Sequence, residues 1–286
     1  MPGLDIPMKL RLFLGKLNPL AYLIPDQLKR KEALIVCCGA HPNYTAWPFM
    51  FTHELIPIVW DCWPKYHATL LQAIHHDRVK TIFCTSRQTR DMVKQKYPHV
   101  HTFWLPEGIN VEAYTHGGPL VKRSIDILEL GRLYKPFHLA VVAYSQQKAI
   151  RHYYSEPGQL LFKNFEELTA GLADAKLTVC YPRCMTHTEM AGNIETLTQR
   201  YWECMLSGTL IVGHAPQELI DVCGYNPVVE IGDDIASQVQ DILVNISQYQ
   251  PLCDRNRDFA VKHCSWSKRV AYIRETLENL GYDCKE

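Results

Sequence analysis

Residues 195–213 read Glu195-Thr-Leu-Thr-Gln-Arg-Tyr-Trp-Glu203-Cys-Met-Leu-Ser-Gly-Thr-Leu-Ile-Val-Gly213. The threonine at position 196 and the glutamine three positions later have capping-box spacing, which predicts a helix that begins close to residue 197. Apolar side chains then recur on one face at helical spacing, and Gly208 can end the helix in a left-handed conformation. The apolar run 209–213 follows directly and is typical of a buried strand. A helix that leads at once into a buried strand indicates an α/β fold.

Short apolar runs rich in valine and isoleucine recur along the chain, separated by stretches of helix length. This alternation is typical of parallel βα units, and near-continuous apolar character indicates strands covered on both faces. We therefore predict an α/β fold with two Rossmann-like, doubly wound domains that face a cleft. The predicted strands are residues 33–38, 56–60, 81–85, 102–105, 125–130, 139–143, 177–180, 209–213 and 227–231.

A turn-rich stretch separates the two series of predicted strands. The segments Pro106-Glu-Gly-Ile-Asn110 and His116-Gly-Gly-Pro119 are suited to a linker. We therefore expect an N-terminal domain over residues 1–118 and a C-terminal domain over residues 119–286. A chain of 286 residues is long enough for two domains, each with its own core.

The composition argues against several classes of protein. Thirty Lys and Arg residues balance 30 Asp and Glu residues, so the formal net charge is zero, which disfavours a protein that binds nucleic acid through its phosphates. No stretch reaches the roughly 18 unbroken apolar residues that a membrane span needs, and no export signal is recognisable. Eleven irregularly spaced cysteines do not indicate a disulfide framework. A cytoplasmic location without nucleic-acid partners is expected.

Residues 1–31 carry a local positive charge. Six basic residues against two acidic ones give this segment a net charge of +4, and apolar residues are mixed among them. Such a segment could lie on an anionic membrane surface as a peripheral contact. The alternative is an amphipathic arm that packs on the body of the protein.

A metal site is not expected from the cysteines. The best cluster of metal-ligand residues is Cys180, Cys184 and His187, which lacks a second pair of ligands at zinc-finger spacing. Buried or half-buried free thiols explain these cysteines better.

Most of the 13 histidines, His138 and His152 among them, are expected to be surface or capping residues. His41 and His53 differ, because they lie near the ends of early predicted strands in the first domain. We expect these two to face the cleft.

Two acidic residues mark the helix predicted after residue 196. Glu195 lies just before its N-terminus, where backbone N–H groups and the helix dipole favour an anion such as phosphate. Glu203 lies two turns further in. A carboxylate at each place could accept hydrogen bonds from sugar hydroxyls, while the alternative is a capped helix with two solvated acids.

The same stretch resembles the E-x7-E signature of retaining nucleotide-sugar glycosyltransferases of the family 4 type, which have two Rossmann-like domains in the GT-B fold. Those proteins typically read E, seven residues, E-A-M-A-x-G-x-P-V-V. The resemblance covers residues 55–285 and is strongest over 185–233. Further segments that resemble the family's motifs, in the family's order, are Ile58-Val-Trp-Asp61, Cys84-Thr-Ser86, Leu105-Pro-Glu-Gly-Ile-Asn110, Leu128-Glu-Leu-Gly-Arg-Leu133, His214-Ala-Pro-Gln-Glu-Leu-Ile220 and Val228-Val-Glu-Ile-Gly-Asp233.

The resemblance implies roles for residues of the C-terminal, donor-binding domain. Glu203 would bind the nucleotide ribose, and Glu195 would bind hydroxyls of the transferred sugar. Arg132 would hold the diphosphate together with Lys135, which follows it sooner than the family's lysine does; Arg200 and Arg183 are the alternatives to Lys135. The predicted donor site is completed by Thr196, Leu197 and Arg200.

The chain departs from the family on both sides of the predicted cleft. Thr196 stands where the family has a glycine after the first glutamate, which implies a rearranged phosphate contact. Trp60 replaces the family's histidine before Asp61, and the N-terminal domain is short for the family. The candidate residues on the acceptor side are His41, Trp60 and Asp61.

The resemblance also implies transfer with retention of configuration from a UDP-, GDP- or ADP-sugar to a saccharide or lipid-linked acceptor. The leaving diphosphate takes the acceptor proton on the same face, so the enzyme contributes positioning and positive charge. Glu195, Arg132 and Lys135 are the predicted catalytic residues. Because the sequence has no Asp-x-Asp pair, no metal and no cofactor beyond the nucleotide sugar are expected.

Two other functions fit the same sequence features. A non-hydrolysing nucleotide-sugar epimerase shares the two-domain fold and would turn over its substrate without an acceptor. A catalytically silent nucleotide-sugar binding or scaffold subunit would bind a nucleotide but never release diphosphate from the donor.

Overall fold

The computed structural model describes residues 32–76, 78–156 and 158–284, and the chain divides into two compact units. Unit 1 comprises Met1–Pro106 and Glu189–Ile194, and unit 2 comprises Glu107–Thr188 and Glu195–Glu286. The basic segment 1–31 and its predicted membrane contact lie outside the described residues. Within the described part of the chain, no helix combines the length and the apolar character that crossing a membrane requires.

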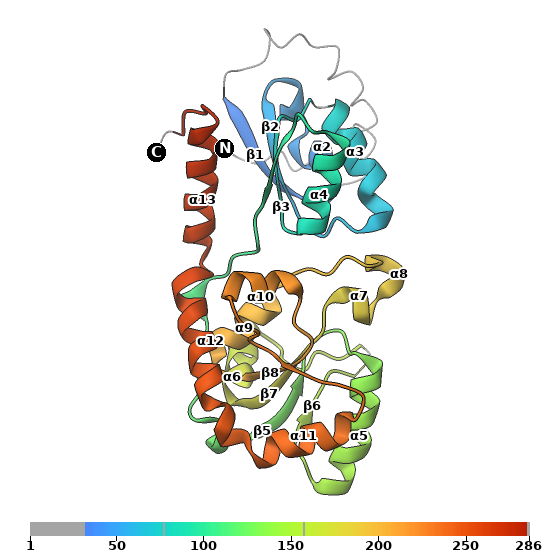
Figure 1. Cartoon of the computed structure of the whole chain (residues 1–286), viewed down its shortest axis with the longest axis vertical. Coiled ribbons are helices and arrows are strands. Elements are labelled where there is room, and N and C mark those ends of the chain that lie inside the picture. Colours follow the sequence, from blue (N-terminus) through green and yellow to red (C-terminus); the bar gives the residue numbers. More distant parts are fainter. Residues whose placement is uncertain (1–31, 77, 157, 285–286) are drawn as a thin grey trace. The chain divides into compact units, whose positions relative to one another are not determined.

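Unit 1 is built on a parallel four-stranded sheet whose core is filled from strands and helices alike. Leu55 and Ile82 of the sheet and Leu70 and Val93 of the helices are buried together. The Ser86 side chain caps a helix by accepting a hydrogen bond from the Thr89 amide. The strands, in sheet order, are β1 (Ala33–Cys38), β2 (Glu54–Val59), β3 (Thr81–Cys84) and β4 (His101–Trp104), and the helices are α2 (Pro42–Ala46), α3 (His67–His76) and α4 (Arg87–Lys96) (Figure 1).

Unit 2 is built on a parallel five-stranded sheet in the order β6-β5-β7-β8-β9. The chain passes from β5 to β6 on one side and then returns to place β7 on the other side of β5. The strand order therefore reverses between β5 and β7, which makes this a doubly wound sheet with a topological switch point. The strands are β5 (Ile125–Glu129), β6 (His152–Tyr153), β7 (Ala175–Cys180), β8 (Leu210–Gly213) and β9 (Val229–Glu230).

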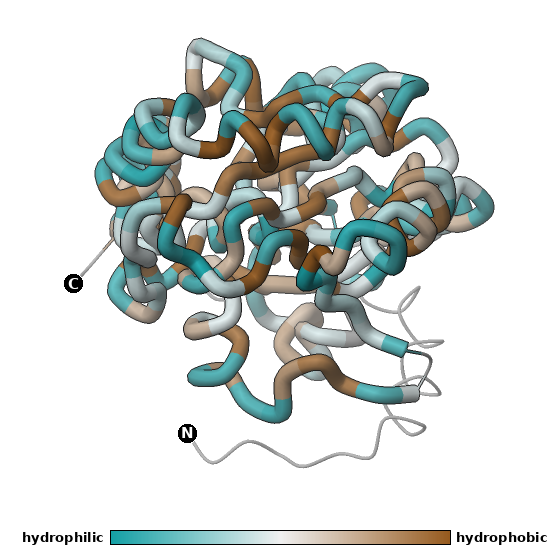
Figure 2. The backbone as a smooth tube through the Cα atoms, turned by 90° about the horizontal axis from the view of Figure 1, so that it is seen from below, coloured by the Kyte–Doolittle hydropathy of each residue, from teal (hydrophilic) through white to brown (hydrophobic). Residues whose placement is uncertain are grey.

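Alternate residues of these strands enter two separate cores. Ile127 packs with side chains of α5 (Lys135–Lys148) and α11 (Ile235–Val244), whereas Leu128 packs with side chains of α6 (Phe165–Asp174) and α9 (Gln199–Ser207). Hydrophobic and hydrophilic residues alternate along the helices (Figure 2), as expected when one helix face covers a sheet. Further helices are α7 (Arg183–Thr186), α8 (Thr188–Ala191), α10 (Gln217–Cys223), α12 (Gln250–His263) and α13 (Trp266–Asn279).

The structure confirms the predicted strands with one exception. The strand predicted at residues 139–143 is wrong, because these residues lie within α5. Phe137, Val141 and Ser145 recur at helical spacing and are buried, while Leu139 is 68% exposed. The two-residue strand β6 was not predicted, because His152 and Tyr153 carry no apolar run.

The helix after Glu195 begins later than its capping-box spacing predicts. It starts at Gln199, and Thr198 occupies the N-cap position. The Gln199 side chain donates a hydrogen bond to the Gly108 carbonyl at 3.1 Å, so it does not reach back to Thr196. The predicted end is confirmed, because Gly208 adopts a left-handed conformation with a φ of +66°.

At Gly213, the last residue of β8, the backbone closely approaches the end of β7. Its φ is +131°, and an added Cβ would collide with the carbonyl oxygen of Cys180. We expect Gly213→Ala to lower the free energy of unfolding by about 1–3 kcal/mol. Gly118→Ala is the matched control, because a Cβ there meets nothing within 4 Å. Urea denaturation of both variants measures the difference, and equal stabilities would contradict the close approach at Gly213.

Candidate functional site

The carboxyl ends of the unit 2 strands bring most of the predicted donor residues to one edge of the sheet. Open α/β sheets bind ligands at this edge, at the topological switch point. The loop after β5 carries Arg132, and Lys135 is the first residue of α5, so both lie beside the switch point and are exposed. Tyr181 follows β7, and its ring packs against that of Tyr134 with centroids 4.2 Å apart. The two strands that flank the switch point are thus linked by an aromatic pair.

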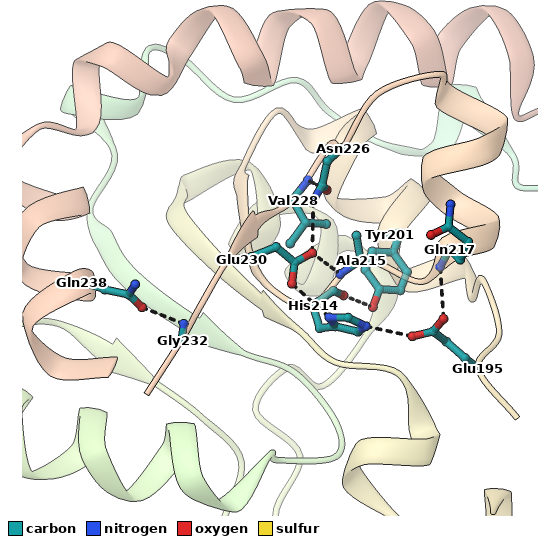
Figure 3. A network of polar contacts seen from close by, with 10 residues as sticks. All are labelled: Glu195, Tyr201, His214, Ala215, Gln217, Asn226, Val228, Glu230, Gly232 and Gln238. Atoms are coloured by element: carbon teal, nitrogen blue, oxygen red, sulfur yellow. Dashed lines mark hydrogen bonds and ion pairs between the residues drawn. The ribbon is translucent and has the colours of Figure 1, made fainter. Parts of the chain in front are cut away.

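A histidine joins two carboxylates at the same edge (Figure 3). His214 directly follows β8, and its Nε2 lies 2.8 Å from Oε1 of Glu195. Its Nδ1 lies 2.9 Å from Oε2 of Glu230, the last residue of β9. If both nitrogens donate to these carboxylates, the ring is a positively charged imidazolium.

The charge state of His214 follows from its surroundings. Partial burial lowers the pKa of His214, but hydrogen bonds to the carboxylates of Glu195 and Glu230 outweigh it, so the pKa lies above its ordinary value. The His214 side chain is 37% exposed, so solvent screens the interaction in part.

Glu195 is anchored to the helix that follows β8. Its Oε2 accepts a hydrogen bond from the backbone N–H of Gln217 at 3.1 Å, and Gln217 is the first residue of α10. A carboxylate at this helix N-terminus satisfies an N–H that has no partner within the helix. Glu195 was expected just before the N-terminus of α9, and the structure places it four residues upstream of that helix.

Glu203 lies on α9 within a separate polar group. Its Oε1 accepts a hydrogen bond from the Tyr114 hydroxyl at 3.2 Å, and its Oε2 lies 2.6 Å from the guanidinium of Arg200. Burial, and next the charge of the Glu203 carboxylate, raise the pKa of Tyr114 above its ordinary value. Two predicted donor residues, Glu203 and Arg200, are therefore paired with each other.

The backbone before α9 is held by a buried acid. The Leu197 N–H donates to Oε2 of Glu218 on α10 at 3.0 Å, and Glu218 is only 5% exposed. The amide of Leu197 therefore has a protein acceptor in this structure, and Thr196 beside it is buried.

The predicted acceptor-side residues lie in unit 1. His41 follows β1, while Trp60 and Asp61 follow β2, so all three are at the carboxyl edge of their sheet. The backbone N–H of Trp60 donates to the Cys38 carbonyl at 2.9 Å. Partial burial lowers the pKa of His41. His53 comes before β2 and lies at the opposite, amino edge of the sheet. The expectation that His53 lies on the same side as His41, facing the cleft, is therefore wrong.

The sequence did not indicate the one group in the described chain whose potential metal ligands converge. It consists of Glu129, His138 and His152, and their ligand atoms lie within 4.8 Å of one another. His138 and His152 are exceptions to the expectation that most histidines are surface or capping residues, because both contact the buried Glu129. The available signal was Glu129 itself, an acid inside an apolar predicted strand. Cys180 instead contacts the sulfur of Cys204 at 3.7 Å.

Neither a protein-family model nor a curated protein sequence matches the chain, but solved structures share its fold. Sucrose-phosphate synthase from Thermosynechococcus elongatus aligns with a TM-score of 0.60 and 13% identity, over 86% of this chain and 73% of that one. Anabaena HepE in complex with UDP and glucose aligns with a TM-score of 0.63 and 12% identity, over 93% of this chain and 83% of that one. A glycosyltransferase from Rickettsia africae aligns with a TM-score of 0.59 and 12% identity, over 99% of this chain and 85% of that one.

These similarities confirm the predicted fold. The chain has the two-sheet, parallel α/β architecture of GT-B glycosyltransferases. At 12–13% identity the likeness extends to the fold alone.

The contacts of His214 predict how stability depends on pH. A histidine whose pKa is raised by folding contributes stability below its unfolded pKa of about 6.5, and this contribution is lost as the pH rises through the folded pKa. The free energy of unfolding of the wild type should therefore exceed that of His214→Asn most at about pH 5.5 and least at about pH 8.5. Urea denaturation across this range is the measurement.

A matched control for His214→Asn is His101→Asn, which replaces an exposed histidine on β4. This variant should have nearly the same free energy of unfolding as the wild type, because the replaced side chain is exposed. A difference between the wild type and His214→Asn that is constant with pH would contradict a charged His214 bridge.

Proposed function

We propose that this protein is a glycosyltransferase that transfers a sugar from a nucleotide-diphosphate sugar to a saccharide or lipid-linked acceptor, with retention of configuration and without a metal ion. The observation that carries the proposal is the E-x7-E pair at a doubly wound sheet, with Glu195 held at the carboxyl edge by His214 and the N-terminus of α10. A protein of similar fold has been solved with UDP and glucose, which supports a nucleotide-sugar donor.

In this proposal unit 2 binds the donor. Arg132 and Lys135 attract the diphosphate, and the N-terminus of α5 adds the positive end of a helix dipole. Glu203 accepts hydrogen bonds from the ribose hydroxyls once its contact with Tyr114 is exchanged. Glu195 accepts hydrogen bonds from the transferred sugar, and His214 fixes the direction of its carboxylate.

The proposed chemistry takes place on one face of the sugar. The bond between the anomeric carbon and the diphosphate oxygen breaks, and a bond to the acceptor oxygen forms on the same side. The acceptor proton passes to the leaving diphosphate, so no side chain has to act as a strong base. Arg132 and Lys135 stabilise the negative charge that develops on the leaving group.

We propose that the acceptor side is the N-terminal domain, residues 1–118, and that the donor domain comprises residues 119–286. The sheet of the acceptor side is that of unit 1, while the linker residues 107–118 belong to unit 2. Asp61 offers a carboxylate to a saccharide hydroxyl, and the Trp60 ring offers an apolar surface for sugar stacking. His41 follows β1, the strand that pairs with β2, and therefore lies at the same edge of the sheet.

A silent nucleotide-sugar binding subunit is the second candidate. It is favoured by Trp60 in place of the family's histidine and by the Leu197 amide, which is already bound to Glu218. An epimerase is distinguished from both by turnover without an acceptor.

The donor site is tested by thermal denaturation with UDP, GDP and ADP and their sugars, first in EDTA and then with magnesium. A ligand at 100 times its dissociation constant should add about 2.7 kcal/mol to the free energy of unfolding. One nucleotide should stabilise the protein in EDTA. Glu203→Gln should bind it about 10–100 times more weakly, because charge-assisted hydrogen bonds to the ribose are lost.

The matched control for this experiment is Glu275→Gln, an exposed acid on α13. The melting temperature of each ligand-free variant separates loss of binding from loss of folding. The proposal fails if no nucleotide stabilises the folded wild-type protein.

Catalysis is tested by the release of nucleotide diphosphate from the selected donor in EDTA, with a panel of saccharides as acceptors. Arg132→Ala should lower kcat by about 10²–10³, because one positive group that stabilises the leaving diphosphate is lost. Lys94→Ala, an exposed lysine on α4, should leave kcat unchanged. Donor binding without release of diphosphate would favour the silent subunit, and turnover without an acceptor would favour the epimerase.

A further inference from the structure

A buried carboxylate in unit 2 is approached by two imidazoles from different elements. Glu129 is the last residue of β5, and its side chain is 2% exposed. His138 Nδ1 from α5 and His152 Nε2 from β6 each lie 2.8 Å from the same atom, Oε1 of Glu129. Three ligand-type atoms from three elements thus converge on one point.

Hydrogen bonds alone leave this group incompletely satisfied. Oε2 of Glu129 is buried and has no hydrogen-bond partner among the described residues. The His152 side chain is 3% exposed, and the carboxylate that it contacts brings a negative charge into the protein interior. An ionised carboxylate at this depth is stable only beside a positive partner, and a bound cation is one such partner.

The surroundings suit a compact site. The Tyr154 ring packs against both imidazoles, with centroid distances of 4.7 Å to His138 and 4.8 Å to His152. His138 is 18% exposed and is the ligand through which an ion would have access. Two imidazoles and one carboxylate form a donor set used for zinc, whereas magnesium and calcium prefer oxygen ligands.

We propose that Glu129, His138 and His152 form a binding site for a divalent transition-metal ion of the zinc type. The ion would join β5, β6 and the first turn of α5. It would therefore stabilise unit 2 next to the loop that carries Arg132. This ion would be separate from the proposed sugar transfer, which is expected to proceed without a metal ion at the diphosphate.

The site is tested by calorimetric titration of EDTA-stripped, dialysed full-length protein with zinc chloride. We expect one zinc ion per chain, a higher melting temperature with zinc, and weaker binding at about pH 5.5 than at pH 7.5, because zinc binds unprotonated imidazole. His138→Gln should weaken binding about 100-fold or more, while His99→Gln, an exposed histidine of unit 1, should bind as the wild type does. Equal zinc binding by His138→Gln and the wild type would overturn the proposal.

X-ray absorption of the zinc-loaded wild type identifies the ligands without any variant. Two imidazole ligands at about 2.0–2.1 Å and no sulfur are expected. Sulfur at about 2.3 Å would assign the ion to cysteines instead, and absence of stoichiometric binding would leave a hydrogen-bonded cluster only. Because these measurements require neither nucleotide nor sugar, their outcome is independent of the proposed transferase activity.

Discussion

Coverage of both faces of the five-stranded sheet is the constraint on which unit 2 depends. Ile127 and Leu128 are neighbours on β5 and enter separate hydrophobic cores, so both faces of the strand are covered by apolar side chains. Ionisable groups are stable in such a unit only where strands end or where a partner compensates them. They are found in these places: Glu129 and Glu230 end their strands, and His214 directly follows β8.

Much of the fold could be predicted because strands and helix ends depend on local sequence. The apolar runs identified almost every strand, and Gly208 identified the end of α9. The start of α9 could not be predicted, since it depends on Glu218 and on the carbonyl of Gly108, which are distant in the sequence. The wrong strand within α5 has a related cause, because a short apolar run fits either state until its buried face is known.

The candidate site was predictable only in part. The spacing of Glu195 and Glu203 identified two candidate acids, but it could not identify their partners. His214 comes from the end of β8, and Tyr114 comes from the segment before β5. Glu129, His138 and His152 have no motif spacing at all, because a strand, a helix and a second strand bring them together. Tertiary structure, not local pattern, creates such groups.

The anchoring of Glu195 has a consequence for any ligand that binds there. Each of its oxygens already accepts one hydrogen bond, one from His214 and the other from the Gln217 amide. Because each carboxylate oxygen can accept a second hydrogen bond, a sugar hydroxyl would use a remaining position without displacing these internal donors. The turn between β8 and α10 would then limit the directions from which a ligand hydroxyl can approach the carboxylate.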